Sequence, residues 1–236
     1  MRTLTFHTLL LTLVLVDPRA TAQGTFQNLG FESAIIVPIP GDPYGSAQFG
    51  PAFPGWTGYI GGIQQTSALY NFTFLDSSAI GIIDTNPFGG PIGVIEGSFT
   101  AVLQAGLGVT FQPADASLSQ TGIIPAGSQS LRFRAYQDYP QGTFAVTIGG
   151  QTLPLATLST GTNYTLFGAD ISAWAGQTSM LSFTAFADRP HLGQNDLALD
   201  SIEFSDIAIP EPGATVLLGL GALLVGWRAL KKKLKL

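Results

Sequence analysis

The chain has 236 residues, of which 45% are hydrophobic, 11% are charged and none is cysteine. The lack of cysteine excludes disulfides, thiolate metal sites and cysteine nucleophiles. No lysine occurs before Lys231, and residues 23–209 hold three basic and thirteen acidic residues, a net charge of −10. An acidic segment of this kind does not bind nucleic acids or anionic membranes through charge.

The first 22 residues have the layout of a secretory signal peptide. Arg2 gives a positive start, Leu9–Val16 is an apolar stretch, and the small residues Ala20 and Ala22 frame a cleavage site. The apolar stretch is too short to span a bilayer, and the proline that follows it disfavours a longer helix. We therefore predict a signal helix in residues 1–22 and export of the remaining chain.

The last residues combine an apolar stretch with a basic end. Residues 214–230 would form about 25 Å of helix against a hydrocarbon core of about 30 Å, so the predicted transmembrane helix is short. Cationic side chains near its end would stay on the cytoplasmic side: Arg228, Lys231, Lys232, Lys233 and Lys235. These charges are separated end to end, which disfavours an amphipathic surface helix.

Pro210, Glu211 and Pro212 directly precede this apolar stretch. The order of tripeptide, apolar span and basic terminus resembles the PEP-CTERM sorting signal of Gram-negative bacteria that make extracellular polysaccharide. In that family the tripeptide is the recognition element for an exosortase, a membrane-embedded transpeptidase-like enzyme to which processing of the tail is attributed. The resemblance implies that residues 210–236 anchor the exported chain in the inner membrane during transit, before it reaches the cell surface or the extracellular space.

Residues 23–209 form the predicted working domain, and their apolar residues alternate as in half-buried strands. In the clearest segment, Ser130–Tyr136, three apolar residues face one side while Arg132, Arg134 and Tyr136 face the other. Further strands are predicted at Ala79–Ile83, Ser98–Ala105, Ala116–Ile124, Gly142–Ile148, Gln151–Leu155, Met180–Phe186 and Leu197–Phe204. A tight turn is predicted at Gly149–Gly150 and a long ordered loop at Val37–Gly62. The pattern predicts an all-β fold, an antiparallel β-sandwich.

Five phrases, in order along this domain, resemble those of galactose-binding-like jelly rolls, the fold of many carbohydrate-binding modules. Asn28–Glu32 resembles the opening strand, and Pro54–Trp56 resembles the tryptophan phrase after it. Ser119–Phe133 resembles a central hairpin, Asp170–Gln177 a short helical turn, and Leu199–Ile202 the closing strand. The resemblance implies that the sandwich is a jelly roll.

In such jelly rolls a structural calcium ion is often held where the first and last strands meet. Glu32 and Asp200 match the positions of two of its ligands, and carboxylate oxygens suit calcium. A calcium site needs about 6 to 8 oxygens, so solvated carboxylates at strand ends, or an ion pair of Glu32 with an arginine, are the alternatives.

Aromatic rings are the usual surfaces on which proteins stack sugars, whose hydroxyls then bind carboxylates and amides. Trp56, Tyr59 and Tyr136 are the candidates for such stacking, with Tyr70 and Tyr139 as further exposed possibilities. The alternative for Trp56 is a lid over the hydrophobic core.

The predicted domain has few residues that could act as a catalytic nucleophile, base or acid. His191 is its sole histidine, and it contains no Gly-x-Ser-x-Gly motif. Two carboxylates can catalyse glycoside hydrolysis, and Asp76, Asp84 and Glu96 are the candidates because they lie near one another in the sequence. The sequence therefore predicts a non-catalytic surface protein associated with extracellular polysaccharide and biofilm. The alternatives are a carbohydrate-binding module with a defined sugar site and, as the weakest interpretation, a glycoside hydrolase.

Overall fold

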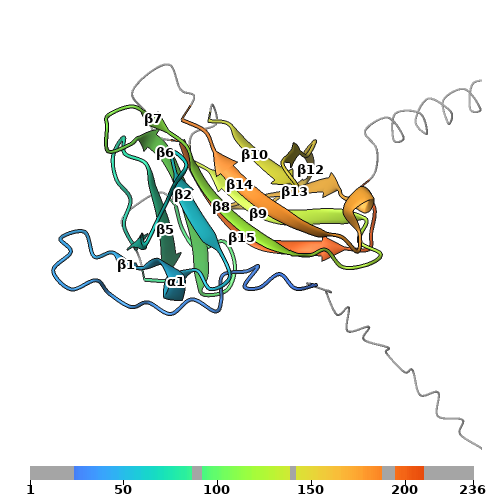
Figure 1. Ribbon diagram of the computed structural model, residues 1–236, viewed down its shortest axis with the longest axis horizontal. Helices are drawn as coiled ribbons and strands as arrows, with labels where there is room; N and C mark the ends of the chain where they lie inside the picture. Colours follow the sequence, from blue (N-terminus) through green and yellow to red (C-terminus); the bar gives the residue numbers. More distant parts are fainter. Residues whose placement is uncertain (1–23, 87–91, 139–141, 188–194, 210–236) are drawn as a thin grey trace, which may run out of the picture.

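The computed structural model describes residues 24–86, 92–138, 142–187 and 195–209, whose regular secondary structure is almost entirely β-strand (Figure 1). Helix is limited, within these ranges, to α1 (Phe49–Ala52) and the 3₁₀ turn η1 (Ser172–Trp174). None of the helices in these ranges is long and apolar enough to cross a membrane. The predicted all-β fold is confirmed. The predicted signal peptide and transmembrane helix lie outside the described residues.

Two sheets pack face to face around one core (Figure 1). Sheet I contains, in spatial order, β1 (Ala47–Gln48), β4 (Ser67–Tyr70), β5 (Ala79–Asp84), β6 (Phe99–Leu107), β15 (Asn195–Ser205), β9 (Ser130–Gln137), β13 (Thr165–Asp170) and β12 (Ala156–Thr160), with β7 (Pro113–Ala114) paired to β6. Sheet II contains β11 (Gln151–Thr152), β10 (Phe144–Ile148), β14 (Thr178–Ala185), β8 (Ala116–Ile123), β2 (Thr57–Ile60) and β3 (Ile63–Gln64). From β8 to β15 the chain crosses to the other sheet at every connection except the hairpins β10–β11 and β12–β13, which is jelly-roll connectivity. Among the paired strands only β4 and β5 run parallel.

The core lies between the sheets and is rich in aromatic rings. Leu131, Phe133 and Ala135 of β9 are buried, as their alternation with polar neighbours predicts. The ring of Phe133 packs against those of Phe144, Phe167 and Phe183, at centroid distances of 6.3, 5.5 and 5.2 Å. Within the described ranges, all residues of this core fall between Phe26 and Phe204, so this part of the chain has a hydrophobic core of its own, as an independently folding domain requires.

The opening segment is not the predicted strand. Residues 28–32 form turns, and Asn28 and Phe31 have left-handed φ values of 51° and 61°. These turns bring the Leu29 carbonyl to 3.0 Å from the amide of Ile202, where a bulge interrupts the pairing of β15 with β9. The segment thus supplies one backbone hydrogen bond to the closing strand instead of a ladder.

Two other connections differ from the prediction. Ser119–Phe133 is not a hairpin, because β8 and β9 belong to different sheets and residues 124–129 cross between them. Within the predicted loop Val37–Gly62, strand β2 pairs with β8. Gly58 of β2 faces the Phe49 ring and the Ile80 side chain, which leave no room for a β-carbon, so the glycine that weakens the strand pattern is required by packing. The predicted turn at Gly149–Gly150 is confirmed, with φ values of 57° and 80°.

Candidate functional site

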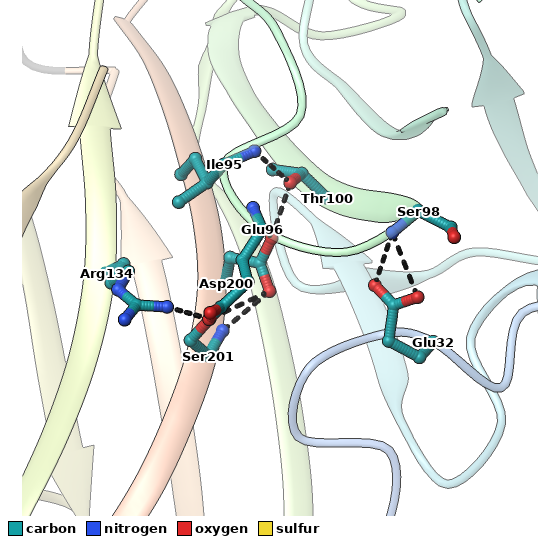
Figure 2. Close-up of polar contacts among 8 residues, drawn as sticks. All are labelled: Glu32, Ile95, Glu96, Ser98, Thr100, Arg134, Asp200 and Ser201. Carbon is teal, nitrogen blue, oxygen red and sulfur yellow. Dashed lines mark hydrogen bonds and ion pairs between the residues drawn. The ribbon is translucent and has the colours of Figure 1, made fainter. Parts of the chain in front are cut away.

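A groove of about 400 Å³ lies over the outer face of sheet I and is lined by six charged side chains. Its charged lining residues are Glu32, Glu96, Arg132, Arg134, Asp200 and Glu203. Arg132 and Arg134, from β9, are the only arginines in the described ranges. Arg134 forms an ion pair with Glu96 (Figure 2). Its guanidinium carbon lies 5.0 Å from the centre of the Tyr164 ring. We call this set the carboxylate groove.

Glu32 and Asp200 hold the same loop from two sides (Figure 2). The two oxygens of Glu32 accept hydrogen bonds from the Ser98 amide at 2.9 and 3.0 Å. Asp200 accepts from the Thr100 hydroxyl at 2.6 Å and from the Glu96 amide at 3.1 Å. The two predicted calcium ligands therefore lie at one site, where both bind the loop of residues 96–100. The sequence analysis did not predict these hydrogen-bond partners.

Asp200 is buried, with 1% of its surface exposed. Burial raises the pKa of Asp200 to about 6, assisted by the charge of Glu32 and opposed by hydrogen bonds from Thr100 and Ser201. A carboxylic acid with a raised pKa is the usual general acid of glycosidases. The oxygens of Asp200, however, face the chain's own donors and not a substrate, so the raised pKa follows from structural burial.

The carboxylates proposed for hydrolysis are engaged separately. Asp84 accepts hydrogen bonds from the Tyr70 hydroxyl and, at 2.7 Å, from the Asn71 amide. Glu96 is bound to Arg134 and to the Ser201 hydroxyl. Asp76 belongs to the loop after β4, where its carbonyl accepts from the amide of Leu107. No two of these carboxyl groups form a pair across the groove, and His191 lies outside the described residues.

The surroundings of Glu32 and Asp200 do not fit a calcium site. A cation needs oxygens directed at one point, whereas amide and hydroxyl donors occupy the sides of both carboxylates that face the loop. In the described ranges, no group of three or more histidine, aspartate or glutamate side chains is placed to hold a metal ion. Calcium binding at Glu32 and Asp200 therefore stays a prediction, one that the local hydrogen bonds do not favour.

We accordingly expect the unfolding temperature of the domain to be the same in calcium chloride and in a chelator. A site filled at 100 times its dissociation constant would stabilise the fold by about 2.7 kcal/mol. For a domain of this size that is a rise of roughly 5–10 °C. Differential scanning calorimetry in the two buffers measures the difference, and a rise of that size would establish the calcium site.

The three predicted stacking residues do not form one surface. Trp56 is a core residue, 5% exposed, and its indole N–H donates to the carbonyl of Asn28 at 3.1 Å. Tyr59 lies half-buried on the outer face of sheet II, and Tyr136 half-buried on the outer face of sheet I beside Val102. The prediction of Trp56 as a sugar platform is wrong, because a large indole next to a Pro-Gly turn fills the space between the sheets. Tyr139 lies outside the described residues.

The structure reveals a different aromatic site, which we call the tip pocket. It has a volume of about 610 Å³ and lies where the loop before β1, the β2–β3 hairpin, the segment before β5 and the β6–β7 turn meet. Its lining includes Asp42, Tyr44, Gln64, Gln65, Phe74 and Gln112. The side-chain amides of Gln64 and Gln112 make no hydrogen bond to another residue of the described ranges, so they are available to a ligand there.

Tyr44 and Phe74 belong to a cluster of three rings at the mouth of the tip pocket. The Tyr44 ring lies 5.0 Å from that of Phe74 and 6.1 Å from that of Phe72, centroid to centroid. The buried side chain of Gln104 accepts from the Phe74 amide at 3.1 Å and donates to the Phe74 carbonyl at 3.3 Å. Gln104 thus pairs with the Phe74 backbone as a strand would, and fixes the ring. The alternating aromatics from Tyr70 to Phe74 were the available sequence signal.

The tip pocket lies at the end of the sandwich opposite the first and last described residues. Ala114, which lines it, is two residues before the start of β8, and the eight residues of β8 extend about 25 Å. At the other end of β8, Ile123 accepts from the amide of Thr25, near the start of the described chain. Near the last described residues, the carbonyl of Ile207 accepts a hydrogen bond from the hydroxyl of Ser130, the first residue of β9. Both ends of the described domain therefore lie on the side away from β1 and β7 (Figure 1).

Comparison with solved structures found distant likenesses. The Stig cyclase Fisc from Fischerella sp. TAU has 16% sequence identity over 76% of this chain and 94% of its own, with a TM-score of 0.43. TmCBM61 in complex with β-1,4-galactotriose has 14% identity over 77% of this chain and 97% of its own, with a TM-score of 0.34. A carbohydrate binding module of family 29 has 16% identity over 57% of this chain and 95% of its own, with a TM-score of 0.30. The jelly-roll assignment therefore rests on the strand order described above.

No curated protein matched the sequence. The family model of the PEP-CTERM protein-sorting motif matches residues 208–232. The match includes Pro210, Glu211 and Pro212, the apolar stretch after them and the first basic residues beyond it. The predicted resemblance of the tail is confirmed: this chain carries a PEP-CTERM protein-sorting motif, which indicates export and membrane-associated sorting.

Proposed function

We propose that the protein is a non-catalytic carbohydrate-binding protein of the cell surface or extracellular matrix, and that the tip pocket is its sugar site. In this proposal an exosortase-type enzyme recognises the PEP-CTERM tail, the C-terminal helix anchors the chain during transit, and the domain then functions outside the cell; the PEP-CTERM motif supports the proposal. The observation that carries the proposal is the tip pocket, in which an exposed aromatic ring stands beside unpaired amides. Neutral sugars outside the cell, in the extracellular polysaccharide of the biofilm matrix or on another carrier, are the ligand class that fits this setting.

The chemistry of the tip pocket matches a neutral sugar. The Tyr44 ring, half exposed, offers a flat face for the apolar side of a pyranose. Gln64 and Gln112 offer both donors and acceptors to sugar hydroxyls, and Asp42 offers a further acceptor. A single carboxylate with no cation in the pocket lining disfavours acidic sugars. The site lacks a pair of accessible carboxylates, so it suits binding without cleavage.

Replacing Tyr44 by alanine is expected to weaken glycan binding about tenfold, or about 1.4 kcal/mol, because the stacking surface is removed while the core is untouched. The measurement is binding to an array of neutral oligosaccharides and to extracted matrix polysaccharide, followed by titration of the best ligand. Tyr136→Ala is the matched control, since Tyr136 is an outer-face tyrosine remote from the pocket, and its binding should equal that of the wild type.

Two results would contradict the proposal. Wild-type protein that binds no glycan would remove the carbohydrate function and leave an exported structural protein. Binding that survives Tyr44→Ala and fails in Tyr136→Ala would move the sugar site to the outer face of sheet I.

A further inference from the structure

Apolar side chains protrude into solvent around the tip pocket. Val109 is 93% exposed, Leu75 89%, Phe111 80% and Ile63 64%. We call these four residues the apolar rim. With Tyr44 they make up five of the nine large hydrophobic side chains that are exposed in the described part of the chain. Exposed apolar patches of this kind mark sites that contact another molecule or a membrane.

The apolar rim comes from strand β3 and two loops, and the Leu107 amide ties the two loops together by donating to the Asp76 carbonyl at 2.7 Å. Ile63 follows the β2–β3 turn, Leu75 lies between β4 and β5, and Val109 and Phe111 form the β6–β7 turn. The β6–β7 turn is closed by hydrogen bonds from the Gly108 amide to the Gln112 carbonyl at 2.8 Å and from the Phe111 amide to the Gly108 carbonyl at 2.9 Å. The rim is therefore a built feature of the fold.

Phe111 adopts a left-handed backbone conformation, with φ 58°. Bulky residues rarely adopt it, because the side chain crowds the backbone. A glycine or asparagine would meet the demands of this turn more easily and would not expose an aromatic ring to water. A strained, exposed phenylalanine is explained when the ring has an apolar environment to enter.

The charges near the tip oppose an anionic surface. Asp42 lines the tip pocket and Asp76 is next to Leu75 in the chain. The two arginines of the described ranges both line the carboxylate groove on sheet I, and no lysine occurs before residue 231. Anionic lipids attract cationic side chains, so a membrane that this tip enters must present neutral headgroups.

We propose that the tip docks onto a lipid surface that carries neutral, sugar-headed lipids. The apolar rim enters the boundary between headgroups and acyl chains, and the tip pocket takes the sugar headgroup. The inference rests on the proposed function, because it uses the same pocket and names the source of its sugar. A soluble polysaccharide would leave the four rim residues in water, whereas a lipid-borne sugar accounts for both the polar pocket and its apolar margin.

The test uses residues 23–209, which contain the core described above, and therefore removes the predicted C-terminal helix that would itself enter a bilayer. Three vesicle preparations are compared by flotation: phosphatidylcholine alone, phosphatidylcholine with galactosyl diacylglycerol, and phosphatidylcholine with phosphatidylglycerol. We expect binding to the galactolipid vesicles to exceed binding to the other two by about tenfold or more. The double variant Val109→Ser/Phe111→Asn should lose this gain, because asparagine keeps the left-handed turn while the apolar rim is reduced.

A matched control separates the apolar rim from general surface hydrophobicity. Met180 and Ile207 are 45% and 43% exposed, outside the tip, so Met180→Ser/Ile207→Ser should bind the galactolipid vesicles as the wild type does. The single variants Val109→Ser and Phe111→Asn, each checked by thermal unfolding, cover the case in which the double variant does not fold.

The outcomes distinguish this inference from the proposed function. Binding of free glycans without binding of galactolipid vesicles would overturn the lipid proposal and leave the sugar site intact. Equal binding to all three vesicles, or no effect of the rim variants, would also overturn it. Self-association that disappears in the rim variant, without vesicle binding, would assign the rim to a second copy of the chain. Loss of both free glycan and vesicle binding in Tyr44→Ala, with only vesicle binding lost in the rim variant, would support both proposals.

Discussion

Replacing Trp56 by alanine is expected to destabilise the domain by about 3–5 kcal/mol, because it removes a large ring from a closed core. The indole is 5% exposed, and its centre lies 5.8 Å from that of Phe31 and 6.3 Å from that of Phe183. It therefore joins the opening turn to sheet II. Chemical denaturation followed by circular dichroism measures the loss, since a fluorescence signal would change with the tryptophan itself.

Trp56→Phe should recover much of the stability lost in Trp56→Ala, because it restores an aromatic ring and gives up only volume and the hydrogen bond to Asn28. Trp174→Ala is the matched tryptophan control. Trp174 is only partly buried on η1, so its loss should cost less. A Trp56→Ala protein as stable as the wild type but unable to bind glycan would contradict the core assignment and restore Trp56 as a stacking residue.

Most of sheets I and II could be predicted because their strands are amphipathic. In β9, Leu131 and Phe133 are buried and alternate with Arg132 and Arg134, so the sequence alone predicts which residues face the core. Strand β13 was missed, since Gly168–Asp170 has the composition of a turn and its pairing with β9 is a long-range contact. Strand β2 was missed for a similar reason, because its Gly58 has meaning only beside Phe49.

At the candidate sites too, the sequence predicted features that depend on neighbouring residues and missed contacts between residues that are distant in the chain. The sequence identified Glu32 and Asp200, because each belongs to a recognisable phrase. It did not reveal that both bind the loop 96–100, which is distant in the chain. The tip pocket was missed entirely, since Tyr44 and Phe74 come from separate loops and only folding brings their rings to 5.0 Å. The sorting motif could be recognised from the sequence alone, because the tripeptide, the apolar stretch and the basic residues follow one another along the chain.

The stability of the domain is expected to depend on pH through Asp200. Its pKa is about 6 in the folded protein, against an ordinary value of 3.8. Between these two pH values the folded state retains a proton that the unfolded state has lost, so the free energy of unfolding falls as pH rises and becomes constant above the folded pKa. The difference of about two pH units corresponds to about 2–3 kcal/mol between pH 4 and pH 7.

Asp200→Asn should remove this dependence, because asparagine keeps the size of the side chain and cannot titrate. The carboxylates with lowered pKa values, Asp42, Asp84 and Asp170, lower stability as pH falls below about 5, but they do so equally in both proteins, so the difference between the two profiles isolates Asp200. Denaturant unfolding at intervals from pH 4 to pH 7, with a chelator present throughout, compares the two profiles. Parallel profiles would show that Asp200 titrates normally. A wild type that loses stability toward pH 7, relative to Asp200→Asn, would show that burial under the loop 96–100 sets its charge.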